Sequence, residues 1–260
     1  MSTILLDFAG PAATLSIHNP AKRNALSRAM WRELPEKISL ATTQPGIHML
    51  ILKSSCPGVF AAGADISEFE ATYANASEAA KANKEIHAAI DAMANCPIPT
   101  VALIDGPCVG GGMALVLGCD IRLASDRARF AITPARLGLS YHPDDITRLV
   151  RACGQALASE LLFGAQIWSA ERGLAAGLVN QLYPGNEFAD ASQSLIDAIC
   201  ANSLDANLAL KRGIATALAP SVIAVNAATE EFSTLFSSPD FVEGRDAFLQ
   251  KRPARFPSHS

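Results

Sequence analysis

Short apolar runs alternate with stretches of helical spacing over the first half of the chain. Residues 3–8 and 12–18 are apolar or alternate between apolar and polar types, which predicts a β-hairpin that turns near Gly10. Residues 47–53 and 100–104 form two further apolar runs, each bounded by turn residues. Runs of this length and character predict buried strands.

Helical spacing separates these strands. Ser27 is a good N-cap, and we expect a helix from there to about Ala41. A second helix is expected over residues 77–95, where apolar residues recur at helical spacing and prolines follow. Residues 113–117 indicate a short helix and residues 120–124 a further strand. Strands that alternate with helices predict an α/β fold with a core of parallel strands.

The second half of the chain has a different pattern. Residues 137–143 indicate a loop, and after about Asp144 the spacing is helical almost to the end. The tail, residues 252–260, carries two prolines and is expected to be irregular. A chain of 260 residues suffices for one large domain with a small appendage. We therefore expect an α/β core followed by a helical subdomain.

Composition narrows the classes of function. The net charge is −4 and the basic residues are scattered, so no nucleic-acid partner is expected. No apolar run approaches ~18 residues and the N-terminus lacks a signal-peptide core, so we expect a cytoplasmic protein without membrane association. The six cysteines show no Cys-x-x-Cys spacing, which favours reduced thiols, and no metal site is expected.

A loop of small residues follows each of the two buried runs, at residues 60–65 and 105–112, and the second ends in three glycines. Small side chains leave backbone N–H groups open to a ligand, and two such groups aimed at one oxygen form an oxyanion hole. A phosphate loop is excluded, because no Gly-Lys-Ser/Thr follows the glycines. Close packing of a helix on a strand explains the glycines about as well, so both interpretations stay open.

The densest group of ionisable residues lies nearby in the sequence, at Tyr141, His142, Asp144 and Asp145. An imidazole moves protons near neutral pH, which makes His142 a candidate acid or base. A solvated loop explains the same histidine, and Asp144 has a structural alternative as a negative charge at a helix N-terminus. Asp65 is better explained as a helix cap than as a catalytic group.

Together these segments resemble the crotonase (enoyl-CoA hydratase/isomerase) superfamily over nearly the whole chain. Each motif alone is modest, whereas their order and spacing together are highly specific. The matching segments are His18–Ser27, Phe60–Phe69, Gly106–Asp120, Phe130–Leu139, Ala170–Val179 and Ser238–Pro253.

The resemblance implies an α/β fold built as a spiral of ββα units with a helical C-terminal region. Residues 1–200 correspond to the core that binds acyl-CoA, and residues 201–260 to a helical trimerisation region. The assembly implied is a homotrimer or a hexamer made as a dimer of trimers. The ligand implied is a coenzyme A thioester, with coenzyme A as part of the substrate and no permanently bound cofactor.

By the same resemblance, the backbone N–H groups of Ala64 and Gly111 form the oxyanion hole around the thioester oxygen. From charge alone the Lys22-Arg23 pair indicates a solvated turn, so its role toward coenzyme A rests on the resemblance. The C-terminal contacts often come from a neighbouring subunit. The coenzyme A contacts implied are Lys22, Arg23, Ala25, Ala62, Ala64, Asp65, Ile66, Phe248 and Lys251.

The acid and base positions depart from the family pattern. Hydratases carry one Glu shortly after the glycines, where this chain has Ala114, and a second Glu after a proline, where it has Ala135. The isomerases of the superfamily also use a Glu at one of these positions. Hydration needs one group that activates water and one that protonates the α-carbon, and alanine does neither. Hydration by the usual two glutamates is therefore not expected.

The absence of both glutamates makes Tyr141 and His142 stronger candidates for the groups that transfer protons. Methylmalonyl-CoA decarboxylases of the superfamily have a similar Thr-Pro-x-x-Leu-Gly-x-x-Tyr stretch, in which a tyrosine matching Tyr141 lies near the leaving carboxylate. They also carry a histidine where this chain has Ala64, so the match is incomplete. His142 stands where dehalogenases and dienoyl-CoA isomerases of the superfamily place an aspartate.

We therefore expect an acyl-CoA enzyme, a lyase or isomerase of the crotonase type, that stabilises a thioester enolate or oxyanion. Proton transfer falls to Tyr141, His142 or Asp145. Decarboxylation, double-bond isomerisation and thioester hydrolysis are the candidate reactions. The alternatives are an enoyl-CoA hydratase with a non-standard site and an acyl-CoA-binding protein impaired in catalysis.

Overall fold

Mostly parallel strands form the centre of the computed structural model, which describes residues 2–72 and 74–259. In this described part of the chain, six strands form the main sheet in the order β1-β2-β3-β4-β6-β9. β1 and β2 pair antiparallel, and the other neighbours are parallel. The strands are β1 (Thr3–Ala9), β2 (Ala12–His18), β3 (Met49–Ser54), β4 (Thr100–Ile104), β6 (Ile121–Ser125) and β9 (Gln181–Tyr183).

A smaller sheet continues the chain beyond the ends of β4 and β6. It contains β5 (Pro107–Val109), β7 (Arg129–Ala131) and β8 (Trp168–Ser169). β5 pairs with β7 in parallel, and β7 pairs with β8 in antiparallel orientation. The sheet therefore ties the second glycine loop, which begins just before β5, to the segment that precedes Ala135.

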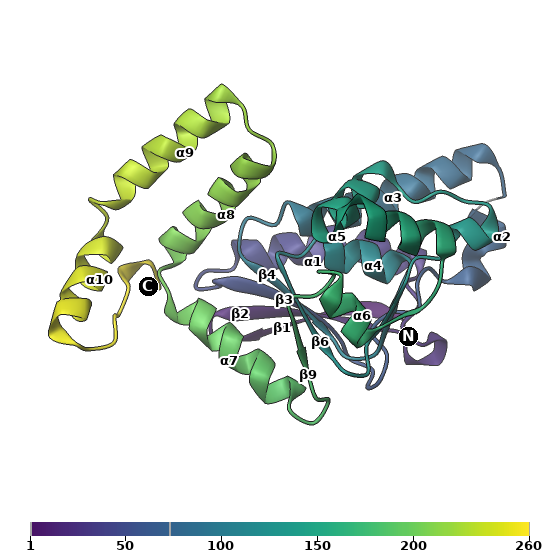
Figure 1. The fold of residues 1–260 in the computed structure, drawn as a ribbon, viewed down its shortest axis with the longest axis horizontal. Helices are drawn as coiled ribbons and strands as arrows, with labels where there is room; N and C mark the ends of the chain where they lie inside the picture. The colour runs from purple at the N-terminus through teal and green to yellow at the C-terminus, as the bar shows by residue number, and fades with distance from the viewer. Residues whose placement is uncertain (1, 73, 260) are drawn as a thin grey trace.

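Helices cover both faces of the main sheet and then continue away from it (Figure 1). Four short 3₁₀ turns accompany them in the described residues: η1 (Pro20–Lys22), η2 (Ile66–Glu68), η3 (Pro134–Leu137) and η4 (Pro257–His259). The helices are α1 (Arg28–Thr43), α2 (Phe69–Thr72), α3 (Ala76–Ala94), α4 (Gly111–Leu117), α5 (Pro143–Gly164), α6 (Ala170–Ala175), α7 (Phe188–Ala201), α8 (Leu204–Leu218), α9 (Val222–Leu235) and α10 (Pro239–Gln250).

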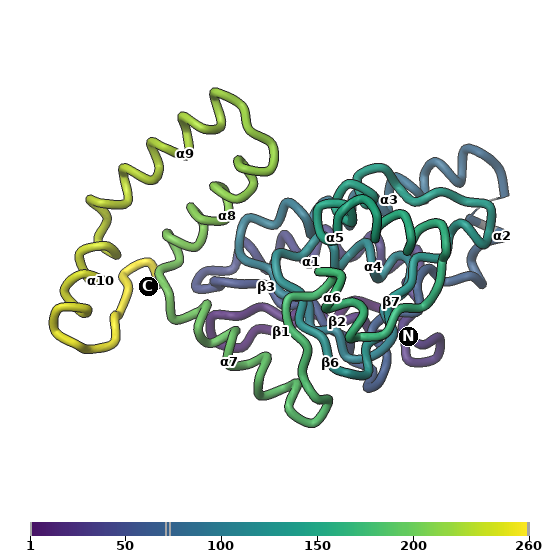
Figure 2. Tube along the Cα trace, in the orientation of Figure 1, coloured from purple at the N-terminus to yellow at the C-terminus, as the bar shows by residue number. Residues whose placement is uncertain are grey.

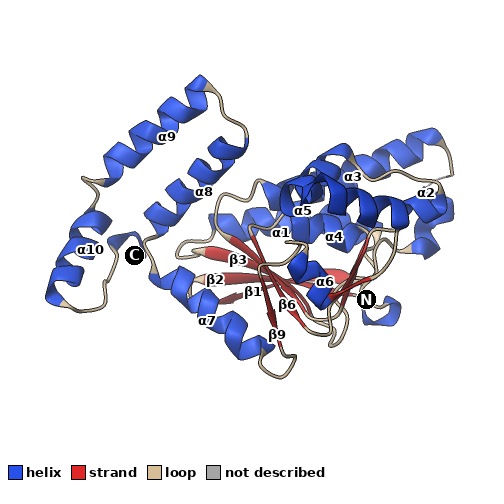
Figure 3. Ribbon diagram, viewed as in Figure 1, coloured by secondary structure: helices blue, strands red, loops and turns tan. Residues whose placement is uncertain are grey.

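The alternation of side chains along β3 separates the two layers of the core. Leu50 and Leu52 face the larger core cluster, which α1, α3 and α4 cover. Met49 and Ile51 face the opposite side, where α7 packs. Neighbouring residues of a strand point to opposite faces, so a continuous apolar run signals a strand buried on both. Figure 3 shows the same arrangement, with α1, α3, α4 and α5 on one face of the sheet and α7 on the other.

Several elements confirm the expectations from sequence. The hairpin pairs Thr3 with His18 and turns at the predicted place. Ser27 caps α1, its hydroxyl accepting a hydrogen bond from the N–H of Met30. The α/β class with parallel central strands is confirmed as well. The 3₁₀ turn η4 lies in the tail that was expected to be irregular.

The expectation of helix almost throughout the region after Asp144 is wrong at two places. β8 and β9 interrupt it, and the sequence pattern also missed β5 and β7. These strands have only two or three residues each, which is too short for an alternation of apolar and polar positions to show. Their pairing with distant strands defines them.

The last helices form an arm that leaves the sheet. α8, α9 and α10 extend to one side, and the tube in Figure 2 shows the chain running out along α8, back along α9 and through α10. The tail then returns to the base of the arm, where Ser258 Oγ accepts a hydrogen bond from the N–H of Leu204. The division near residue 200 into two units stays a prediction. Within the described residues, no helix has the length and apolar character needed to cross a bilayer.

Candidate active site

The two loops of small residues lie side by side. Ala61 and Cys108 form a parallel bridge, and the N–H of Val109 donates to the carbonyl oxygen of Ala61 over 2.9 Å. A Cβ built at Gly110 would lie 3.8 Å from the Cα of Gly63. The structure therefore brings together the two predicted segments, which the sequence separates by a whole helix.

Several backbone N–H groups in these loops are available to a ligand, and those of Ala64 and Gly111 are among them. The flanking groups are engaged: the N–H of Asp65 donates to Leu26 O over 3.0 Å, and the N–H of Gly110 donates to Ala131 O over 2.9 Å. Within the described residues, the N–H groups of Ala64 and Gly111 have no hydrogen-bond acceptor. Such groups are normally paired or hydrated, so free donors in a structured loop are what an oxyanion site requires.

The three glycines have a structural reason of their own. Gly110 has a φ of 52°, in the region that side chains disfavour. A Cβ at Gly111 would lie 2.8 Å from the Trp31 ring, and a Cβ at Gly112 would lie 2.7 Å from the Cβ of Ala61. Close packing thus accounts for the glycines, and the availability of the Gly111 N–H is a separate observation.

Leu26 and Trp31 connect the two halves of the site. Leu26 bridges to Ala64 in parallel orientation, and its N–H donates to Gly63 O over 2.8 Å. Leu26 Cδ1 also lies 3.8 Å from a Cβ built at Gly111. Leu26, Trp31 and Ala64 line one small pocket together. Buried side chains of α1 and the preceding turn therefore hold Ala64 next to Gly111.

The Lys22 turn is joined to the first loop by an ion pair. Lys22 Nζ lies 2.6 Å from Asp65 Oδ2 and 2.6 Å from Ser67 Oγ. Asp65 is buried and caps η2 through the N–H of Ser67, which confirms its predicted structural role. Burial alone raises the pKa of the Asp65 carboxyl, but the hydrogen bonds from Lys22 and Ser67 outweigh it and hold the pKa below its ordinary value.

The other residues expected to contact coenzyme A differ in exposure. Arg23, Ala62 and Ile66 are exposed near the Lys22–Asp65 pair, where a ligand can reach them. Ala25 is buried, and its N–H and carbonyl oxygen are bonded within the turn to Lys22 O and Asn19 Nδ2. The structure thus gathers this part of the predicted site on one surface.

Asn24 supports this turn, and the sequence analysis missed it. The side chain is fully buried at a φ of 55°. Its amide nitrogen donates to Ile17 O, Ser54 Oγ and Phe60 O, and its oxygen accepts from the N–H of Asn19 over 2.7 Å. One asparagine therefore ties the turn to β2, β3 and the first loop. A buried amide among turn residues gives no distinctive signal in a sequence.

Phe248 and Lys251 lie apart from the other predicted contacts. Phe248 is 82% exposed on α10, and Lys251 ends that helix at a φ of 54°. α10 lies at the far end of the arm, away from the strands (Figure 1). Within one chain, these two residues do not join the Lys22 turn and the Ala64 loop.

Neither Ala114 nor Ala135, the two positions at which the sequence analysis noted a missing glutamate, offers an acid or base. Ala114 is 1% exposed inside α4, packed in the core. Ala135 is an exposed residue of η3. No other position of α4 carries an ionisable side chain.

Tyr141 extends the site from the other side of the second loop. Its hydroxyl donates to Gly110 O over 2.9 Å, directly before the free N–H of Gly111. Burial, followed by the charge of nearby Asp145, raises the pKa of the Tyr141 phenol well above its ordinary value. The group is therefore a neutral hydrogen-bond donor and a poor base.

Asp145 is held in an ion-paired chain. The carboxylate is almost fully buried and lies 2.8 Å from Arg148 Nη1, while Arg148 Nη2 lies 2.7 Å from Asp91 Oδ1. Burial raises the pKa of Asp145, and Arg148 opposes that shift. Asp145 therefore has a structural role at the start of α5, because its Oδ1 is already bound to the Arg148 guanidinium.

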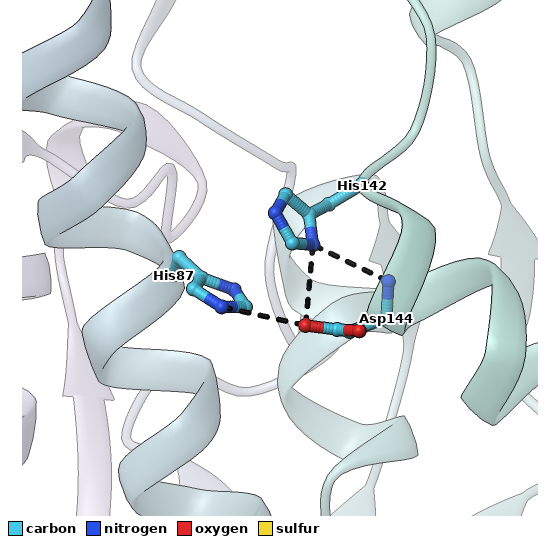
Figure 4. A group of neighbouring side chains, drawn as sticks. All are labelled: His87, His142 and Asp144. Carbon is cyan, nitrogen blue, oxygen red and sulfur yellow. Dashed lines mark hydrogen bonds and ion pairs between the residues drawn. The ribbon is translucent and has the colours of Figure 1, made fainter.

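His142 caps α5 and stacks on a second histidine. Its Nδ1 accepts a hydrogen bond from the N–H of Asp144 over 3.3 Å, and its ring centroid lies 4.1 Å from that of His87 in α3 (Figure 4). A pocket of about 200 Å³ is lined by both histidines, Tyr141, Asp145 and Ser140 among others. His87 was not predicted from sequence.

Comparisons with known proteins agree on one family. A sequence model described as enoyl-CoA hydratase/isomerase matches residues 9–259. The mitochondrial methylglutaconyl-CoA hydratase of Rattus norvegicus is 31% identical over 250 residues, which is 93% of this chain and 78% of that protein. The crotonyl-CoA hydratase of Syntrophomonas wolfei is 28% identical and covers 97% of each chain.

Solved structures resemble the fold over its whole length. A putative enoyl-CoA hydratase/isomerase family protein from Hyphomonas neptunium superposes with a TM-score of 0.94 at 36% identity, covering 98% of this chain and 97% of that one. A protein of Magnetospirillum magneticum described as enoyl-CoA hydratase/carnithine racemase gives 0.95 at 32% identity, covering 99% and 96%.

Proposed function

Because the chain belongs to the enoyl-CoA hydratase/isomerase family and is an acyl-CoA-processing enzyme, we propose that its reaction is decarboxylation of a malonyl-type coenzyme A thioester. The observation that carries this proposal is a pair of N–H donors without hydrogen-bond acceptors in the described residues, combined with alanine at positions 114 and 135. An enolate can form in such a site if the electrons come from a breaking C–C bond, since no proton has to be removed.

The reaction has two steps under this proposal. The bond between the α-carbon and the carboxylate breaks, carbon dioxide leaves, and the electron pair passes into the enolate. The N–H groups of Ala64 and Gly111 then hold the negative charge on the thioester oxygen, a type of contact that contributes about 3–4 kcal/mol per donor. The α-carbon takes up one proton, which comes ultimately from solvent.

Tyr141 is the group we assign to the side of the leaving carboxylate. Its phenol is neutral, and its bond to Gly110 O fixes it beside Gly111. Once its bond to Gly110 O is exchanged for one to the substrate, a neutral donor can orient the substrate or deliver the proton to the enolate, whereas it cannot remove a proton at neutral pH. His142 and Asp145 are less suited, because one caps α5 and the other is paired with Arg148.

The arm supports the proposed homotrimer, or hexamer built from two trimers. Its helices α8 and α9 have no buried residue in the described chain. Large apolar side chains are exposed along the arm: Leu210, Ile214, Leu218, Val222, Ile223, Phe232, Phe236, Phe248 and Leu249. Apolar surface of this extent needs a partner. In a trimer, Phe248 and Lys251 would reach coenzyme A bound to a neighbouring subunit.

The experiment that tests the proposed reaction is product identification in D₂O. Purified protein would be incubated with malonyl-CoA, methylmalonyl-CoA, crotonyl-CoA and a 3-enoyl-CoA, and the thioesters analysed by mass spectrometry. We expect acetyl-CoA and propionyl-CoA that carry one deuterium from solvent. Hydroxyacyl-CoA from crotonyl-CoA would favour the hydratase that the names of the relatives suggest, and binding without turnover would favour an acyl-CoA-binding protein.

A further inference from the structure

Two histidines and an aspartate, from α3 and the start of α5, come together beside the pocket that Tyr141 lines. His87 comes from the middle of α3, His142 from the cap of α5 and Asp144 from its first turn. His87 Nε2 lies 3.4 Å from Asp144 Oδ2, and His142 Nδ1 lies 3.8 Å from the same oxygen (Figure 4). One donor atom from each residue lies within 4.8 Å of the other two.

We propose that His87, His142 and Asp144 bind a divalent transition metal ion, and that Zn²⁺ is the ion they take most readily. Two imidazole nitrogens and one carboxylate oxygen are a donor set that suits zinc. Ligand atoms about 2.0–2.1 Å from a tetrahedral ion lie roughly 3.4 Å apart. The separations at Asp144 Oδ2, 3.4 and 3.8 Å, are close to that value.

The charges around this cluster favour a cation. Asp91 and Asp145 flank it and share one guanidinium, that of Arg148, at 2.7 and 2.8 Å. Together with Asp144 they make three carboxylates beside one permanently charged guanidinium. The net charge around the cluster is therefore negative while the histidines are neutral. A divalent ion balances this charge.

Metal binding requires only small adjustments of exposed side chains. His142 is 44% exposed and Asp144 56%, so both can turn toward an ion. The ion would replace two contacts: the 3.3 Å hydrogen bond from the N–H of Asp144 to His142 Nδ1, and the contact of His87 Nε2 with Asp91 Oδ2 at 2.9 Å. Asp91 then lies beside the ion as a further oxygen donor.

One feature of the cluster limits the affinity that we expect. Binding through Nε2 places the ring proton of His87 on Nδ1, and within the described residues this buried atom has no hydrogen-bond partner. A partner at the second nitrogen is worth about 10–100-fold in metal affinity. We therefore expect binding in the micromolar range. Three protein ligands leave a further position, which Asp91 or a water molecule can take.

The test is zinc binding by the full-length protein after treatment with a chelator, measured against a chromophoric chelator and without any thioester. We expect one zinc ion per chain. His87→Ala, His142→Ala and Asp144→Asn should each weaken binding by at least about tenfold. His18→Ala is the matched control, because His18 lies outside the cluster and bonds Ser55 at the surface.

Folding is checked by circular dichroism, and thermal unfolding supplies a second readout. Zinc should raise the Tm of the wild-type protein and of His18→Ala, but not that of the cluster variants, because an ion that binds only the folded state stabilises it. Failure of the wild-type protein to compete with the chelator would overturn the proposal, as would equal affinity in folded cluster variants. Neither result depends on decarboxylation, so the two proposals fail or stand separately.

Discussion

The hydroxyl of Tyr141 donates a hydrogen bond to the carbonyl oxygen of Gly110, 2.9 Å away. This bond crosses from the loop before α5 to the residue that precedes Gly111. It places a neutral phenol beside the free N–H group of Gly111. The loop that carries Tyr141 and the glycine loop are thereby fixed relative to each other, which is what a site for a small acyl group requires.

Removal of this hydroxyl should lower activity more than stability. In Tyr141→Phe, we expect the free energy of unfolding to fall by about 1 kcal/mol, the usual contribution of one hydrogen bond. Turnover should fall by about 100-fold, since positioned proton donors contribute at least that much. Tyr183→Phe is the control, because its hydroxyl bonds Gln181 at the surface. Urea unfolding and turnover of methylmalonyl-CoA measure both effects, and equal turnover in the two variants would remove Tyr141 from the site.

Substitution of Gly111 separates the role of its N–H from its packing. Both Gly111→Ala and Gly111→Pro introduce atoms against the Trp31 ring, 2.8 Å from a new Cβ, but only proline removes the N–H. Proline is tolerated at the first position of a helix. We expect the proline variant to turn over about 10²–10³-fold more slowly than the alanine variant. Similar rates in two folded variants would contradict the oxyanion role.

The sequence predicted the two loops of the site better than it predicted the residues that support them. The two loops, Ala64 and Gly111 stand out because small residues follow apolar strands, and this pattern is local. Asn24 did not stand out, because only the fold shows that its amide is buried between β2, β3 and the first loop. His87 and Asp91 are four residues apart in the sequence. This spacing is equally typical of a solvated helix face, so it did not single out His87. Its proximity to His142 follows from the approach of the start of α5 to α3, where Arg148 Nη2 also lies 2.7 Å from Asp91 Oδ1.

The triple glycine shows why one pattern supports two interpretations. Gly111 and Gly112 are required by the approach of α4 to Trp31 and Ala61, as the packing explanation predicts. The free N–H of Gly111 has a separate cause, because Gly111 is the first residue of α4 and the first N–H groups of a helix have no intrahelical partner. A sequence shows where side chains are absent, but not whether the space is filled by a neighbour or left for a ligand.

The ion pair of Asp65 predicts a pH-dependent difference in stability. The pKa of Asp65 is lowered in the folded protein from an ordinary value of 3.8. Its contribution is therefore fully present above that value and is lost as the pH falls through the folded pKa. We expect Asp65→Asn to be less stable than the wild type at neutral pH, with the gap closing below about pH 4.

Urea unfolding at several pH values from neutral to acidic measures that gap. Asp7→Asn is the control, because Asp7 is exposed on β1. Its difference from wild type should stay small throughout. A gap for Asp65→Asn that persists unchanged in acid would show that the ionised carboxylate does not supply the stability.

The proposed sharing of sites between subunits can be tested by complementation. Phe248→Ser impairs the arm but leaves the Ala64 and Gly111 donors intact, whereas Gly111→Pro impairs the donors but leaves the arm intact. If α10 serves a neighbouring site, oligomers mixed from these two inactive proteins should recover part of the wild-type turnover. Light scattering confirms that the mixed species form. Mixed trimers that recover no activity would show that Phe248 does not act across a subunit boundary.

The most direct test of the central claim compares two reactions in one preparation of wild-type protein. Release of carbon dioxide from methylmalonyl-CoA and loss of the conjugated absorbance of crotonyl-CoA are measured as kcat/KM under the same conditions. We predict a decarboxylation value at least about 100-fold above that for hydration, because Ala114 and Ala135 supply neither a base nor an acid. Rapid hydration with no release of carbon dioxide would contradict the account and assign the protein to the hydratases.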